Sequence, residues 1–168
     1  MLELNAIDAE KYVPFVVGHF EATNRHINAS DVKRVYDLFN GHTFYIQKTF
    51  NESFADTREG EVCTLDTIRT AINNIIASND TIFREILSNI PEKQKELLYA
   101  IAKDGKAEQI TSAEFIKRHR LTSASSVQSA TKKLLEKDII TERNKIYSLN
   151  DKLFAMWINK LYGNTTML

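Results

Sequence analysis

The stretch that decides the fold is residues 91–149, PEKQKELLYAIAKDGKAEQITSAEFIKRHRLTSASSVQSATKKLLEKDIITERNKIYSL. Pro91 favours the start of a helix because the first helical position needs no N–H donor, and Gly105 favours its end in the left-handed conformation. The capping-box pattern TSAE at 111–114 predicts a second helix, and Thr-Ser at 122–123 can cap a third. The apolar positions at helical spacing, which predict the buried faces of these three helices, are Leu97, Leu98, Ile101, Phe115, Ile116, Val127, Ala130, Leu134 and Leu135.

Two short strands follow the third helix. Asp138 ends that helix, residues 139–141 and 146–149 have strand composition, and residues 142–145 form the turn between them. Three helices followed by such a hairpin are the layout of a winged helix-turn-helix domain. Folds of this kind commonly place the third helix and the hairpin, the wing, against duplex DNA. A last helix over 152–162 should pack its apolar side chains onto the domain, namely Leu153, Met156, Trp157 and Leu161.

Composition indicates a helix-rich protein. The chain has 168 residues, 43% of them hydrophobic, which is enough for one good core or two small ones. Only five glycines and two prolines argue for few long loops. A single cysteine, Cys63, excludes an intramolecular disulfide framework and favours a reducing compartment. No apolar run approaches the length of a membrane span, so we expect a cytoplasmic protein with no membrane partner.

The neutral net charge conceals an asymmetry along the chain. Residues 1–87 carry 8 Lys and Arg against 13 Asp and Glu, a balance of −5, whereas residues 88–168 carry 14 against 9, a balance of +5. A basic second half is a weak electrostatic footprint for phosphate backbones. It is also within the range of ordinary soluble domains, so it only modestly favours a nucleic-acid partner.

The first half predicts a separate all-helical unit. Helices are expected over 9–22, where Pro14 would suit the first turn, from about Asn28 or Ser30 to Asn40-Gly41, and over 43–55. A polar loop at 56–61 should precede a long helix capped by Thr64 and interrupted at 78–80. Pro91 places the boundary between the two halves near residues 88–91. Residues 2–7 alternate apolar and polar side chains, like a short strand or an extended lead-in.

One segment of this half resembles a known family. Residues 40–47 read NGHTFYIQ, after the apolar helix positions Tyr12, Phe15, Val16 and Phe20 and the motif Ile27-Asn28…Val32. The order is similar to that of the helical lid of prokaryotic AAA+ ATPases of the signal-transduction (STAND) type. In those proteins a Gly-His-Pro-aromatic-Tyr-apolar-Gln segment opens a lid helix, and a winged helix follows the lid. Thr43 stands here in place of the proline, and no arginine follows in that helix to read a γ-phosphate.

This resemblance implies a domain organisation and a nucleotide-facing site. It assigns residues 1–88 to a lid-like domain, 89–163 to the winged helix-turn-helix domain and 164–168 to a tail. The fold class is then mainly α, a lid-like bundle followed by a winged helix with a small β-hairpin. The residues that would form the lid wall of a nucleotide site are Gly41, His42, Thr43 and Tyr45.

Two motifs of nucleotide hydrolysis are absent from the sequence. There is no G-x-x-x-x-G-K-[ST] loop to cradle triphosphate oxygens, and no strand ending in paired acidic residues to hold Mg²⁺. We therefore expect a non-catalytic C-terminal fragment of a longer ATPase, with no catalytic residues and no cofactor of its own. ATP and Mg²⁺ would be cofactors of the parent protein, and the parent's nucleotide-binding domain would be a partner. The oligomeric state stays open.

The remaining reactive residue types form no recognisable site. His19, His26, His42 and His119 have no metal-ligand spacing, and one cysteine completes no zinc set, so no metal is expected. Cys63 precedes a helix, which would lower its pKa, but a structural cysteine is the stronger interpretation. The serines cluster on one predicted helix without a partner base, so no nucleophilic triad can be assigned.

That serine cluster is the sharpest functional signal. It occupies the recognition-helix position, where small hydroxyls permit close approach to a groove, Gln can pair with adenine edges and Lys neutralises phosphate. The predicted DNA-binding residues on this helix and the wing tip are Ser125, Ser126, Gln128, Ser129, Lys132, Lys133, Arg143 and Lys145. Lys117, Arg118 and Arg120 near the preceding turn can add backbone contacts.

Three functions remain open from the sequence. The winged helix of a AAA+/STAND ATPase binds double-stranded DNA, or it serves protein–protein or autoinhibitory contacts, or the chain is a free-standing winged-helix transcription regulator. A solvated helix whose Ser and Lys only confer solubility would explain the same pattern on the recognition helix. A P-loop encoded upstream in the parent gene would separate the first two functions from the third.

Overall fold

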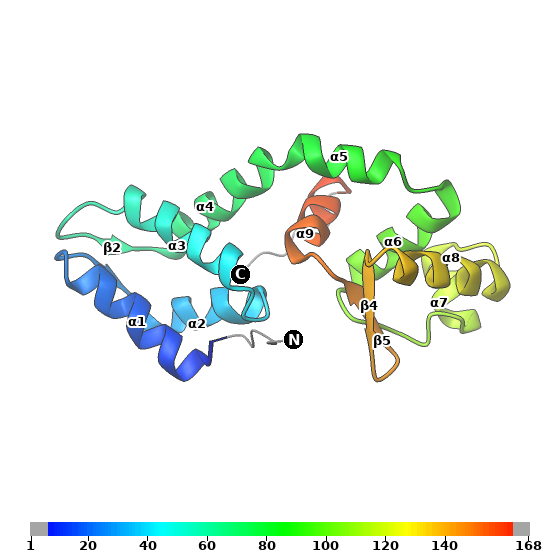
Figure 1. Ribbon diagram of the computed structural model, residues 1–168, viewed down its shortest axis with the longest axis horizontal. Coiled ribbons are helices and arrows are strands. Elements are labelled where there is room, and N and C mark those ends of the chain that lie inside the picture. Colours follow the sequence, from blue (N-terminus) through cyan, green and yellow to red (C-terminus); the bar gives the residue numbers. More distant parts are fainter. Residues whose placement is uncertain (1–6, 163–168) are drawn as a thin grey trace. The chain divides into compact units, whose positions relative to one another are not determined.

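The computed structural model describes residues 7–162, which divide after Ser78 into two compact units. Residues 2–6 of the predicted lead-in and the predicted tail at 164–168 lie outside the described residues. Both units are mainly helical, as the sequence predicts, and Figure 1 labels most of their elements.

Between residues 7 and 78, the first unit contains four helices and two very short strands. In chain order they are α1 (Ala9–Glu21), β1 (His26–Ile27), α2 (Ala29–Leu38), α3 (Thr43–Asp56), β2 (Val62–Cys63) and α4 (Leu65–Ser78). The four predicted helices are confirmed, including the interruption that ends α4 at Ser78. The strands were not predicted. They pair in parallel, with His26 opposite Val62 and Ile27 opposite Cys63.

The core of the first unit combines aromatic residues from α1, α3 and the end of α2 with aliphatic residues, and α4 contributes only aliphatic ones. Its buried apolar side chains are Tyr12, Val16, Phe20, Ile27, Val32, Val35, Phe39, Ile46, Phe50, Cys63, Ile68, Ala71, Ile72, Ile75 and Ile76. Two expectations about α1 are wrong. Pro14 lies inside the helix rather than in its first turn, and Phe15 is 68% exposed.

Helix α3 buries hydroxyls as well as apolar groups. Thr49 and Ser53 are fully buried, and Thr57 follows at the same spacing. Each hydroxyl donates to the carbonyl four residues earlier, over 2.7–2.8 Å. The helix therefore satisfies its own buried polar groups, which would otherwise be costly in a core.

The second unit is a winged helix with an additional helix at each end. Its elements are α5 (Asp80–Ser88), α6 (Glu92–Asp104), β3 (Ala107–Glu108), α7 (Ala113–His119), α8 (Ala124–Glu136), β4 (Ile140–Arg143), β5 (Ile146–Leu149) and α9 (Lys152–Leu161). The strands form one antiparallel sheet in the order β3-β5-β4. The sequence predicted the hairpin but not β3, which is two residues long.

Local signals at the helix ends are mostly confirmed. Gly105 follows α6 with a φ of 71°, and Ser123 caps α8 by accepting from Ser126 N–H. The capping box at 111–114 is wrong in register, because Ser112 rather than Thr111 caps α7 and accepts from Phe115 N–H. Helix α7 ends at His119, and Arg120 after it adopts the left-handed conformation.

The wing has a tighter turn than predicted. Glu142 and Arg143 belong to β4, where they pair with Tyr147 and Ile146, so the tip is only Asn144 and Lys145. Both tip residues have positive φ, 53° and 65°. Two consecutive positive φ values are the requirement of a type I′ turn, whose twist matches that of the strands. Arg143 is therefore a strand residue beside the tip rather than a member of it.

Helix α5 packs with the winged helix, although the sequence placed the boundary ten residues later. Phe83 is buried against the rings of Phe154 and Trp157 on α9, with centroids 5.2 and 5.7 Å apart. Trp157 Nε1 also donates to Asp80 Oδ1 over 2.8 Å. These contacts assign α5 to the second unit. Pro91 therefore separates two helices of that unit, α5 and α6, rather than two units.

Helix α9 buries a different stripe from the one expected. Leu153 and Trp157 are buried as predicted, but their companions are Phe154 and Ile158. Met156 is only half-buried and Leu161 is 44% exposed, so these two expectations are wrong. Asp151 caps the helix by accepting from Leu153 and Phe154 N–H, which sets its start.

Candidate nucleotide wall and nucleic-acid interface

The four residues predicted for a nucleotide wall lie together where α3 begins. Gly41 is buried with a φ of 73°, a conformation that only glycine adopts without strain, and its N–H donates to Tyr36 O over 3.0 Å. This turn makes His42 the N-cap residue of α3, with Thr43 as the first residue of the helix. The chain reverses direction between α2 and α3, so the predicted wall residues lie at the N-terminal end of α3.

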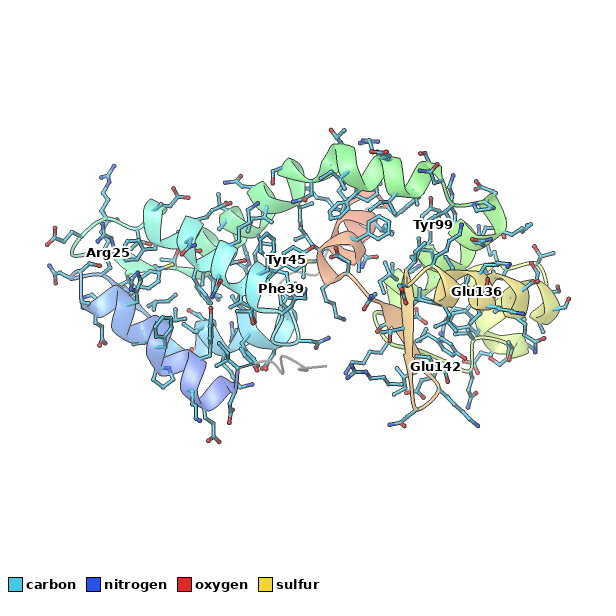
Figure 2. The ribbon with its side chains drawn as sticks, in the orientation of Figure 1. Arg25, Phe39, Tyr45, Tyr99, Glu136 and Glu142 are labelled. Atoms are coloured by element: carbon cyan, nitrogen blue, oxygen red, sulfur yellow. The ribbon has the colours of Figure 1, made fainter. Side chains whose placement is uncertain are left out.

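Aromatic rings dominate that helix end. The imidazole of His42 stacks on Tyr45 with centroids 4.8 Å apart and an interplanar angle of 27°. Tyr45 in turn contacts buried Phe39 at 5.5 Å, and Figure 2 labels this pair. Phe44 stands edge-on to Tyr45 and is 62% exposed. The arrangement offers flat apolar surface to a planar group, whereas residues 39–47 contain no Lys or Arg to hold phosphate.

Phe44 does not belong to the buried side of α3. Aromatic residues at helical spacing are usually core, which would place Phe44 with Phe50 and Phe54. Ile46 and Phe50 are four residues apart and buried, but Phe44 lies about 200° around the helix from Ile46 and faces outward. The helical period of 3.6 residues therefore already indicates that Phe44 is exposed.

The predicted DNA-binding residues of α8 are mainly exposed. Val127, Ala130, Thr131 and Leu134 form its buried side. The predicted residues on its exposed surface are Ser125, Gln128, Ser129, Lys132 and Lys133. Ser126 is half-buried in the first turn. Lys133 is not a free cation, because its Nζ lies 2.9 Å from Glu136 Oε2, and this hydrogen bond lowers the pKa of Glu136.

The cations before α8 differ in the ion pairs and hydrogen bonds that they form. Arg118 is tied to Asp104, with Nη2 and Oδ2 2.7 Å apart, and Asp104 also contacts His119 Nε2 at 3.1 Å. Lys117 and Arg120 are exposed. Lys93, which the sequence analysis did not consider, donates to Thr122 Oγ1 over 2.8 Å, and so a lysine of α6 lies at the turn that leads into α8.

A groove of about 870 Å³ runs between α8 and the wing. Helix α8 lines it with Gln128, Thr131, Lys132, Leu135 and Glu136. The other lining residues come from the hairpin and from β3 with the turn after it, and they are Glu142, Asn144, Lys145, Ile146, Tyr147, Glu108, Gln109, Ile110 and Thr111.

This groove contains only part of the predicted interface. Gln128, Lys132 and Lys145 line it, whereas the other five predicted residues do not. Three carboxylates that were not predicted, Glu108, Glu136 and Glu142, also line the groove. Glu142 lies opposite Tyr147 in the ladder, and burial together with this carboxylate raises the pKa of Tyr147. The positions of Glu108 and Glu142 depend on the strand pairing, which includes the unpredicted β3.

Other chemistry is sparse in the described part of the chain. No group of three His, Cys, Asp or Glu side chains that could hold a metal occurs between residues 7 and 162. Cys63 is fully buried, and desolvation raises its pKa, which agrees with a structural cysteine and contradicts a pKa lowered by the following helix. Over the same residues, none of the helices has the length and apolarity to cross a bilayer.

Comparisons with known proteins concern both units. Residues 81–160 match a family model described as a probable winged helix domain. A search of curated protein sequences gave no match. Among solved structures, the Walker-type ATPase PABY2304 of Pyrococcus abyssi is similar, with a TM-score of 0.64 and 13% identity.

That structural match covers most of this chain but less than half of the ATPase. It includes 92% of the present chain and 42% of the ATPase chain. At such low identity the likeness is one of fold, and it extends across helical unit and winged helix alike. The protein therefore carries a winged helix domain over residues 81–160 and shares its fold with part of a Walker-type ATPase.

Proposed function

We propose that this chain is the lid and winged-helix part of a AAA+ ATPase of the STAND type. In this proposal the first unit closes one side of a nucleotide site and the second unit binds double-stranded DNA. The observation that supports it is the fold shared over 92% of the chain with 42% of a Walker-type ATPase. The family's phosphate-binding elements would lie in the part of the parent protein that this chain does not contain.

The proposed role of the first unit is to contact the base of a nucleotide. His42 and Tyr45 present stacked rings beside exposed Phe44, and the buried Gly41 turn fixes their position at the start of α3. Flat apolar rings suit a purine, while the absence of Lys and Arg from residues 39–47 leaves the phosphates to other groups. The unit would couple nucleotide state to the winged helix.

The proposed role of the second unit is to bind a duplex through α8 and the wing. Ser125, Gln128 and Ser129 offer hydroxyl and amide groups on an exposed helix surface, and Arg143 and Lys145 are exposed cations of the wing. The balance of +5 over residues 88–168 attracts a polyanion. Hydrogen bonds to base edges would come from Gln128, and phosphate contacts from the cations.

Fluorescence anisotropy with a random-sequence duplex tests the DNA proposal. Wild-type protein should bind at low salt and lose affinity steeply as salt rises. The variant Lys132→Ala/Lys133→Ala should weaken binding to all sequences and reduce the salt slope by roughly one unit per lost phosphate contact. Replacing Gln128 with Ala should instead alter the preference between sequences.

A matched control removes two cations from the other unit. Lys11→Ala/Lys33→Ala makes the same change in net charge on α1 and α2 and should leave the salt slope unchanged. Absence of binding at low salt, or equal losses in the two double variants, would contradict DNA binding by α8.

A second function is favoured by one observation. Three carboxylates, Glu108, Glu136 and Glu142, line the groove between α8 and the wing. Carboxylates at that place repel phosphates, so they favour protein contacts for this part of the winged helix.

A further inference from the structure

The turn that joins α2 to α3, residues 39–42, contains a pair of residues with chemistry of its own. Asn40 and Gly41 are the sole Asn-Gly pair of the 168-residue sequence. Such a pair cyclises readily, because glycine has no Cβ to hinder attack by its amide nitrogen on the preceding side chain. The Asn40 side chain is exposed, so water and base reach it. The sequence therefore supplies a site for spontaneous deamidation.

Deamidation of this pair proceeds in two steps. The Gly41 nitrogen gives up its proton to base and attacks Asn40 Cγ, so that an N–Cγ bond forms, the Cγ–Nδ2 bond breaks and ammonia leaves. Water then opens the cyclic imide at either of its two carbonyls. One opening gives aspartate, and the other gives isoaspartate, in which the main chain runs through the side-chain carbons. Water is the only reactant that the chain does not contain, and base acts as catalyst.

The backbone of the turn holds the attacking nitrogen in a hydrogen bond. Asn40 has a φ of 50° and Gly41 a φ of 73°, so both lie in the left-handed region. Asn40 N–H donates to Asp37 O over 3.1 Å, and Gly41 N–H donates to Tyr36 O over 3.0 Å. These are the two hydrogen bonds of a Schellman motif at the end of α2. The attack on Asn40 requires that Gly41 N–H lose its proton, which breaks the second of these bonds.

Packing around the turn opposes that opening. Gly41 is buried, and Phe39, immediately before the pair, is 1% exposed. The ring of Tyr45 contacts Phe39 at 5.5 Å and His42 at 4.8 Å, and Figure 2 labels Phe39 and Tyr45. One ring therefore connects the residues before and after the Asn-Gly pair. The Gly41 amide reacts only after these contacts have opened.

We propose that Asn40 is a modification site that the fold protects: its deamidation proceeds only through local opening of the α2–α3 turn, and isoaspartate then prevents the turn from closing again. The additional main-chain carbon lies between the nitrogens of residues 40 and 41, which donate the two Schellman bonds, so the two bonds no longer form together. The inference does not rest on the proposed nucleotide function, because only the turn itself enters it.

The test compares the full 168-residue chain with a free peptide of residues 34–47. Both are incubated at mildly alkaline pH, and peptide mapping by mass spectrometry measures the conversion of Asn40. The folded chain should react about thirty-fold more slowly than the peptide, since a packed turn is open in only a small fraction of the molecules. Asn40→Gly keeps the left-handed conformation without the reacting amide, so its mapped fragment should show no mass gain.

Hydrogen exchange gives an independent readout of the same opening. Gly41 N–H exchanges with solvent only when its bond to Tyr36 O is broken, so its protection factor should equal the slowing of deamidation within about three-fold. The Phe50 amide, in the buried middle of α3, should be protected more strongly because it does not open with the turn. Equal protection of the two amides would mean that global unfolding, and not the turn, controls the reaction.

Two ring truncations complete the test. Tyr45→Ala removes the ring that connects Phe39 to His42 and should accelerate deamidation about five-fold, the effect of losing such aromatic contacts. Phe15→Ala is the matched control, because it removes a ring of α1 that is 68% exposed. It should change the rate by less than about two-fold. Equal acceleration by the two variants, or deamidation of the folded chain at the rate of the peptide, would overturn the proposal.

Discussion

Lys145 occupies the most constrained position of the wing at the scale of single residues. It follows Asn144 in a two-residue turn where both φ angles are positive. Asparagine tolerates this conformation, and glycine is the usual second residue, but a long side chain pays a steric cost there. A cation is thus kept at the tip of the wing at some expense in stability.

Lys145→Gly should stabilise the winged helix. Glycine adopts the positive φ without strain, and this gain should exceed the additional chain entropy by roughly 0.5–1 kcal/mol. Urea denaturation measures the change. Lys145→Ala is the matched control, because it removes the same charge and retains the strain, so it should not stabilise. Equal effects of the two variants would show that charge rather than backbone conformation matters at the tip.

Asp80 makes stability depend on acid pH. Its carboxylate accepts hydrogen bonds from Arg84 Nε and Trp157 Nε1, and these lower its pKa below the ordinary value of 3.8. A lowered folded-state pKa contributes stability above the unfolded-state pKa, which is lost as pH falls through the folded value. Asp80→Asn should therefore flatten the fall in unfolding free energy below about pH 4.

The control for this pH effect is Asp66→Asn. Asp66 pairs with Arg69 at 2.9 Å on the surface of α4. Its replacement should change the acid limb of the stability curve less than that of Asp80. If the unfolding free energy falls equally at acid pH in wild type and Asp80→Asn, Asp80 is not the source of this pH dependence.

At the scale of elements, α9 shows how the sequence can indicate a helix and still misassign its buried face. Leu153 and Trp157 are compatible with two stripes, one through Met156 and Leu161 and one through Phe154 and Ile158. The structure has the second, since Phe154 and Trp157 must both reach Phe83 of α5. That contact joins residues about 70 positions apart, which periodicity within one helix cannot reveal.

Trp157→Ala and Leu161→Ala should differ sharply in their effect. Trp157 is 3% exposed, and truncation of such a core side chain costs about 3–5 kcal/mol. Leu161 is 44% exposed, so its truncation should stay within about 0.5 kcal/mol. Equilibrium denaturation measures both, and comparable losses would mean that the first, predicted stripe is the buried one.

Helices and strands also differed in how well they could be predicted. Caps and 3.6-residue periodicity extend over many positions, and they located the four helices of the first unit and α6 to α9. The strands β1, β2 and β3 are two residues long, which is too short for any alternation to register. Their pairing comes from the packing of the surrounding helices, which the local sequence does not encode.

The two candidate sites also differ in how well the sequence could predict them. The predicted nucleotide wall lies in one continuous segment, so a sequence motif could identify its residues, which are Gly41, His42, Thr43 and Tyr45. The groove joins α8 to residues from β3 and the wing, and strand pairing rather than the local sequence brings Glu108 and Glu142 to it. Nucleotide and DNA contacts at these residues stay predictions.

At the scale of the whole molecule, the absence of a phosphate-binding loop leads to a prediction about ATP. The chain offers aromatic rings for a base but no P-loop, so base stacking alone should bind nucleotide weakly. Calorimetry should detect no ATP binding at micromolar concentrations, and phosphate release should be undetectable. Tyr45→Ala provides the comparison. A micromolar affinity, or turnover above a protein-free blank, would contradict the proposal.

The parallel pairing of β1 with β2 has a consequence for synthesis on the ribosome. His26 pairs with Val62, 36 positions later, and Gly60 N–H donates to Asn24 O across the same junction. Chain growth delivers α1, α2 and α3 before this partner strand exists. The strand pair can therefore form only after Cys63 has left the exit tunnel, so the first unit closes late in its own translation.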